Sequence, residues 1–159
     1  MQYDTIYHEH LRYYSLLSLK YLFTKHNLEI FYAKQINTHG GSIRVYVSRK
    51  GKYKVKPSVN KIIGIEKNKI YKNSSINRFI KRVTVSKIKI YKLLKNIKEA
   101  NKRIIGVGAP SRSSTYINYT GIDNNLINFT MEIKGSEKIG SYMPGTLIPI
   151  VEEDLKKLN

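Results

Sequence analysis

The sequence predicts an α/β fold, in which a helix and a β-hairpin come first, long helices follow, and a partial, truncated Rossmann-like parallel sheet comes last. Apolar residues recur at helical spacing in separate stretches of the first two thirds. Two runs rich in apolar residues flank a turn with two glycines, which is typical of a hairpin. The last third follows the order helix, strand, glycine loop, helix, strand, which is typical of a parallel sheet.

The first expected elements are a helix and the hairpin. Ser15 suits the N-cap of a helix that runs to about His26, because its hydroxyl can accept from the free amides of the first turn. Asn27 suits the end of that helix. Strands are expected at residues 29–36 and 43–48, where apolar and polar residues alternate in the second run.

The later elements are read in the same way. In order, we expect helices at about 59–70 and 73–101, a short buried strand at 103–108, a helix at 113–119, a strand at 126–132, an extended piece at 147–150, and the start of a helix at 152–158. A doubly wound domain has at least one further strand after that last helix. The sequence is therefore expected to be cut short.

The composition favours one domain, with a basic surface. The chain has 159 residues, of which 41% are hydrophobic, and a formal net charge of +18. Such a charge ordinarily indicates nucleic acid as a partner. The lysines, however, are scattered beside Ile, Asn and Tyr. AT-rich coding sequences produce this amino-acid composition whatever the function of the protein. We therefore do not expect nucleic acid, although the basic stretch at 81–103 should favour anionic ligands such as a nucleotide diphosphate.

Two absences narrow the class of protein. The sequence has no cysteine, which excludes a disulfide framework and a thiolate metal site. No stretch approaches roughly eighteen uncharged apolar residues, and no secretory signal is visible. We expect a cytoplasmic protein with no membrane partner.

Histidine is scarce, with 4 in the chain, and two of them lie in the stretch Tyr7-His8-Glu9-His10. Imidazole takes and gives protons near neutral pH and also binds metals. The alternative is a set of polar residues that caps the following helix, but their density favours proton chemistry. A metal on His8 and His10 would require a strand, on which residues two apart point the same way, and no third ligand is evident. We expect no metal.

A glycine loop at residues 106–111 is the second candidate site, because it follows a predicted strand and precedes a predicted helix. Backbone amides at such a place can receive phosphate. Ser111 stands where a dinucleotide fingerprint has its third glycine, so we do not expect a standard NAD site. The hydroxyls and guanidinium of residues 111–115 favour an anionic or hydroxyl-rich ligand over a simple packing turn. At residues 38–42, turn chemistry alone favours a hairpin turn.

Five motifs, taken in order, resemble one family. They are DTIYHEHL at 4–11, THGGSIR at 38–44, GAP at 108–110, NYTGI at 118–122 and YMPGT at 142–146. The family is that of the S-adenosylmethionine-dependent C-methyltransferases that act on nucleotide-linked keto sugars (tetronitrose C-methyltransferase-like). The resemblance is to the C-terminal part of its members.

The resemblance implies a base that removes the proton next to a sugar ketone, after which the enolate attacks a sulfonium methyl group. His10 matches the proposed base of the family's Tyr-x-Glu-His motif, and Glu9 and Tyr7 match the positions that orient it or bind sugar hydroxyls. Imidazole and phenol suit these tasks, since the reaction needs a base near neutrality and a donor for the enolate oxygen. The implied substrate-binding residues are His39, Gly40, Ser42, Gly108, Ala109, Pro110, Arg112 and Asn118.

The family pattern also includes a cysteine-held zinc domain and a Rossmann-like domain for S-adenosylmethionine, and neither matches this chain. S-adenosylmethionine would then be bound by a region absent from it. The implied partners are a nucleotide-diphosphate sugar and a separate chain that binds S-adenosylmethionine. Residues 1–56 would be the remnant edge of the methyltransferase domain, and residues 57–159 an incomplete Rossmann-like substrate domain. A non-catalytic module that binds nucleotide sugars, or an inactive gene fragment, are the alternatives.

Overall fold

The computed structural model describes residues 3–38 and 41–154, which form two compact units. The first unit consists of residues 12–80. The second consists of residues 81–154 together with the amino-terminal residues 3–11. The division into residues 1–56 and 57–159 expected from the sequence concerns the family domains to which the two segments correspond. That division stays a prediction.

Two predicted helices of the first unit are confirmed, and the second begins two residues before the expected position 59. α1 (Leu16–Lys25) follows Ser15, whose hydroxyl accepts from the backbone N–H of Ser18 at 3.1 Å, while the Ser18 hydroxyl accepts from the N–H of Ser15 at 3.0 Å. This reciprocal pair is a capping box. α2 (Pro57–Lys69) opens with a proline, which suits a first helical position because no intrahelical bond is needed from it there.

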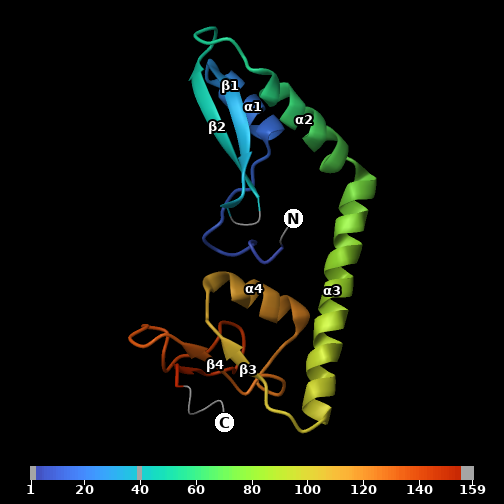
Figure 1. The fold of residues 1–159 in the computed structure, drawn as a ribbon, viewed down its shortest axis with the longest axis vertical. Coiled ribbons are helices and arrows are strands. Elements are labelled where there is room, and N and C mark those ends of the chain that lie inside the picture. Colours follow the sequence, from blue (N-terminus) through green and yellow to red (C-terminus); the bar gives the residue numbers. More distant parts are fainter. Residues whose placement is uncertain (1–2, 39–40, 155–159) are drawn as a thin grey trace. The chain divides into compact units, whose positions relative to one another are not determined.

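The hairpin of the first unit is also confirmed. β1 (Leu28–Ile36) and β2 (Ser42–Arg49) pair antiparallel beside α1 and α2 (Figure 1). A bulge between Ile30 and Tyr32 adds one residue to β1, so Ile30 and Ala33, three positions apart, are both buried. The buried core of this unit consists of Leu16, Ile30, Ala33, Val59, Ile62 and Ile63.

The long helix α3 (Asn73–Glu99) is confirmed, although its middle is rich in β-branched residues of weak helix propensity. Its predicted apolar stripe is used only in part. Ile90 and Leu94 pack against the core of the second unit, whereas Ile80 and Leu93 are exposed. Among the described residues, no helix has the length and apolar character needed to span a membrane.

The second unit contains the predicted parallel sheet. β3 (Ile105–Val107), β4 (Phe129–Glu132) and β5 (Ile150–Glu152) pair in the order β3-β4-β5. The helix α4 (Ser111–Thr120) connects β3 to β4, as in a β–α–β unit (Figure 1). The buried core consists of Ala109, Ile117, Ile122, Leu126, Met143, Ile148 and Ile150.

Two strand predictions need correction. The strand expected from residue 126 begins at Phe129, because the amides of Leu126 and Ile127 bond back to the carbonyl of Asp123 in a turn. The strand expected to be buried before the glycine loop is only half-buried. Its last residue, Val107, is 77% exposed, since β3 is an edge strand of a small sheet.

The helix expected from residue 152 is wrong at its start. Glu152 pairs with Glu132 as the last residue of β5, and residues 153 and 154 are neither helix nor regular turn. Pairing with β4 provides hydrogen bonds for the backbone of Ile150 and Val151 and positions them beside the core. This tertiary stabilisation outweighs the helical preference of the residues that follow. Residues 155–158 of the expected helix lie outside the described part of the chain.

Candidate functional site

The segment of residues 3–11 packs on α4 in the second unit through polar contacts. The Asp4 carboxylate lies 3.7 Å from Nε of Arg112. The Thr115 hydroxyl donates to the carbonyl oxygen of Ile6. Both partners on α4 lie in its first half, so this helix positions the backbone that leads into Tyr7 and His10.

Aromatic rings make a second contact between this segment and α4. The ring of Tyr3 stacks on Tyr116 with centroids 5.9 Å apart and meets Tyr119 edge-on at 5.4 Å. Burial, reinforced by Tyr116, raises the pKa of Tyr3. The phenol is therefore neutral at physiological pH, which suits a ring that serves as an apolar anchor.

His10 forms hydrogen bonds at both of its ring nitrogens. Nδ1 lies 2.8 Å from the carbonyl oxygen of Thr5, and Nε2 lies 3.3 Å from the hydroxyl of Tyr7. Because a carbonyl oxygen only accepts, Nδ1 carries the hydrogen of the neutral imidazole. Nε2 then presents a lone pair, to which the Tyr7 hydroxyl donates.

The structure brings Tyr7 and His10 together, with ring centroids 4.3 Å apart. Tyr7 is half-buried, whereas Glu9 and His10 are exposed. The Glu9 carboxylate lies 3.8 Å from Nε2 of His8. Within residues 3–38 and 41–154, no three His, Cys, Asp or Glu side chains gather as metal ligands.

This arrangement suits proton abstraction at Nε2. The Thr5 carbonyl fixes the tautomer and orientation of His10 and stabilises the imidazolium that forms when Nε2 takes a proton. The Tyr7 hydroxyl, 3.3 Å from the same nitrogen, is a donor placed beside the reacting position. A base and a donor side by side are what the formation of an enolate requires.

The loop Gly108–Pro110 joins β3 to α4 and is fixed from two sides. Gly108 has φ +79°, in the left-handed region that favours glycine. The N–H of Ala109 donates to Oε2 of Glu132 at 2.8 Å, and Nζ of Lys138 donates to the carbonyl oxygen of Ala109 at 2.8 Å. Both backbone polar groups of Ala109 therefore have partners on the chain itself.

Neither Glu132 nor Lys138 lies in a sequence motif that predicts a functional role. The position of Glu132 could have been inferred from the sheet topology. Glu132 ends β4, which is parallel to β3, and the carboxyl ends of neighbouring parallel strands lie at the same edge of a sheet. Lys138 lies in an irregular segment after β4, where no periodic pattern marks it. Its contact with Ala109 depends on the path of that segment.

The predicted residues are divided between the two units. Ser42, in the first unit, donates its hydroxyl to the carbonyl of Thr38 at 3.1 Å, while His39 and Gly40 lie outside the described residues. Those in the second unit are Tyr7, Glu9, His10, Gly108, Ala109, Pro110, Arg112 and Asn118.

Asn118 ties together two of the sequence motifs. Its Nδ2 donates to the carbonyl oxygens of Ser114 and Pro144, each at 2.8 Å. Gly145 packs against this carboxamide with φ +78°, and a Cβ there would lie 2.8 Å from Cγ of Asn118. The observed role of Asn118 is thus to hold the turn of residues 142–146, and its contact with a substrate stays a prediction.

Gly145→Ala is expected to lower the free energy of unfolding by about 2 to 4 kcal/mol, because it adds both a strained φ and a clash with Asn118. Gly135→Ala is the matched control: Gly135 has φ +80°, but a Cβ there meets nothing within 4 Å, so a loss of only about 1 kcal/mol is expected. Urea denaturation measures both. In an Asn118→Ala background the loss from Gly145→Ala should shrink to that of the control. An unchanged loss would contradict the clash.

Comparison with known proteins gives two matches. The profile of the family described as C-methyltransferase C-terminal domain matches residues 37–158. The chain is also 30% identical to C-methyltransferase NovU of Streptomyces niveus over 151 residues. That alignment covers 94% of this chain and 36% of the relative, so the chain spans about a third of the relative's length.

Proposed function

Because the chain belongs to the family of C-methyltransferase C-terminal domains, we propose that it is the substrate-side part of an S-adenosylmethionine-dependent C-methyltransferase that acts on a nucleotide-linked keto sugar. The observation that carries this proposal is the pair of hydrogen bonds on His10. They leave Nε2 as the basic nitrogen and put a phenol hydroxyl beside it.

In the proposed reaction, Nε2 of His10 removes the proton from the carbon next to the sugar ketone. The Nδ1–H bond to the Thr5 carbonyl stabilises the resulting imidazolium. The Tyr7 hydroxyl turns from Nε2 to the ketone oxygen and donates to it as negative charge develops there. S-adenosylmethionine, when bound, would supply the methyl group that the enolate carbon takes up, and its methyl–sulfur bond would break as the neutral thioether leaves. Glu9 binds a sugar hydroxyl or orients the base.

The proposed contacts with the nucleotide sugar lie on the unit that carries His10. They come from the loop Gly108–Pro110, from Arg112 at the start of α4, and from Asn118. Support comes from the packing of residues 3–11 on the first half of α4, since that helix begins directly after the loop. A contact from His39, Gly40 or Ser42 stays a prediction from the sequence motif.

We place the methyl-donor site on protein outside this chain, either on a longer form or on a separate partner chain. The support is that the chain aligns with only 36% of C-methyltransferase NovU, so most of that protein has no counterpart here. The same observation favours a second candidate, a non-catalytic module that binds nucleotide sugars. The two differ in whether the chain restores methyl transfer when it is combined with the missing part of a family member.

Titration calorimetry of this chain is expected to give saturable heat with a thymidine-diphosphate keto sugar and none with S-adenosylmethionine. The reason is that the proposed substrate contacts lie on the chain and the proposed donor site does not. Saturable binding of S-adenosylmethionine would contradict the location of the donor site. Absence of sugar binding would contradict the substrate-side role.

A further inference from the structure

The carboxyl ends of β3 and β4 form the edge at which sheets of this type receive ligands. The loop Gly108–Pro110 lies at that edge, directly before α4, where a backbone amide commonly receives phosphate. Here the position already holds an anion of the chain itself. Oε2 of Glu132 lies 2.8 Å from the backbone nitrogen of Ala109.

We infer that Glu132 is a specificity-determining residue: its carboxylate takes the place of a ligand phosphate at the loop Gly108–Pro110 and keeps the diphosphate of a nucleotide sugar away from it. The identity of the ligand rests on the proposed function. The sequence alone favours an anionic ligand at this loop. With Glu132 in that place, the diphosphate would bind at other parts of the surface.

The contacts of Glu132 show why a phosphate would compete poorly. One carboxylate oxygen accepts from Ala109, and the other accepts from the backbone N–H of Ile133 at 3.1 Å. Lys138, a cation beside the loop, donates to the Ala109 carbonyl at 2.8 Å. A phosphate at the Ala109 amide would first have to displace the carboxylate and would then stand beside a like charge.

The carboxylate remains ionised at physiological pH. The N–H of Ala109 and then that of Ile133 lower the pKa of Glu132. Desolvation opposes them in part, and the Lys138 ammonium adds a weaker lowering of the pKa. Protonation therefore does not vacate the Ala109 amide near neutrality. The carboxylate still has lone pairs that accept from hydroxyl groups, which suits an uncharged, hydroxyl-rich sugar better than a diphosphate.

The test is amide NMR of the ¹⁵N-labelled chain titrated with inorganic pyrophosphate at neutral pH. In the wild-type chain, the Ala109 cross-peak is expected to stay in place while pyrophosphate is added. In Glu132→Ala, which frees the amide, the same peak is expected to move saturably, with an affinity at least about tenfold higher than at the wild-type loop. Glu153→Ala is the matched control, because it removes one exposed carboxylate next to the end of β5 and leaves the Ala109 contact intact.

Each outcome bears on the inference. A wild-type Ala109 peak that moves saturably with pyrophosphate would overturn it, as would an unmoved peak in a folded Glu132→Ala chain. Movement in Glu153→Ala equal to that in Glu132→Ala would also overturn it, since the effect would then be one of net charge. If Glu132→Ala does not fold, the wild-type titration and Glu132→Gln decide: the amide oxygen of Gln can still accept from Ala109, so exclusion should persist. None of these measurements depends on His10 or on methyl transfer.

Discussion

His10→Ala is expected to lower the rate of methyl transfer by roughly 10²- to 10⁴-fold, the usual contribution of a general base. The reason is that the variant loses the nitrogen Nε2, whose lone pair is set by the bond from Nδ1 to the Thr5 carbonyl at 2.8 Å and which lies 3.3 Å from the Tyr7 hydroxyl. The rate is measured on the chain combined with the part of C-methyltransferase NovU that it does not cover.

His8→Ala is the matched control for this prediction. His8 is an exposed imidazole two residues away. Its Nε2 lies 3.8 Å from the Glu9 carboxylate, and its ring meets the Tyr7 ring edge-on with centroids 5.9 Å apart. Exposed ion pairs contribute little, so the control should keep its rate within a few-fold of the wild type. Equal losses in the two variants would mean that the segment as a whole, and not the nitrogen of His10, is required.

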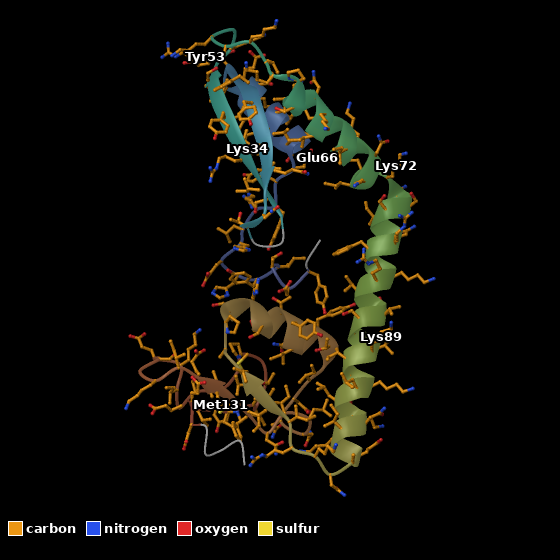
Figure 2. The ribbon with its side chains drawn as sticks, viewed as in Figure 1. Lys34, Tyr53, Glu66, Lys72, Lys89 and Met131 are labelled. Carbon is orange, nitrogen blue, oxygen red and sulfur yellow. The ribbon has the colours of Figure 1, made fainter. Side chains whose placement is uncertain are left out.

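Glu66→Ala is expected to lower the free energy of unfolding of the first unit by roughly 3 kcal/mol. Glu66 lies on α2 (Figure 2) and is buried. Its two carboxylate oxygens accept from the backbone amides of Leu16 and Leu17 at 2.7 and 2.9 Å. These amides open α1 and have no partner within the helix. Removing the carboxylate takes away the acceptor of both amides. It also removes the contact between the start of α1 and α2.

Urea denaturation and hydrogen exchange test this prediction together. Exchange at the Leu16 and Leu17 amides should accelerate in Glu66→Ala, while amides of the core in the second unit keep their protection. Glu66→Gln, which keeps one amide oxygen as an acceptor, should show an intermediate loss. Glu137→Ala, at an exposed carboxylate in the second unit, is the control and should change stability by less than about 0.5 kcal/mol. Equal stability of Glu66→Ala and the control would contradict the role of Glu66.

Local patterns were sufficient to predict most of the fold. Ser15 and the apolar spacing after it mark α1, and two runs rich in apolar residues on either side of a glycine turn mark the hairpin, because both signals arise within a few neighbouring residues. The strand β5 could not be predicted in this way. The sequence favours an extended piece only up to residue 150 and a helix from residue 152, and pairing with β4 makes Ile150–Glu152 a strand.

The candidate site was predictable in its residue types and not in its contacts. The rarity of histidine and the family motif pointed to Tyr7, Glu9 and His10. The Thr5 carbonyl that sets the tautomer of His10 has no side-chain signature, since every residue carries a carbonyl group. The partner of the glycine loop, Glu132, became visible only when β3 and β4 were paired, because the contact joins residues 23 positions apart.

The most direct test of His10 as the base is solvent deuterium exchange at the carbon next to the ketone of a nucleotide-linked keto sugar. The exchange is followed by proton NMR in the combined protein without methyl donor. We expect the wild type and His8→Ala to exchange this proton and His10→Ala not to exchange it. Exchange at the wild-type rate in His10→Ala would contradict this role of His10.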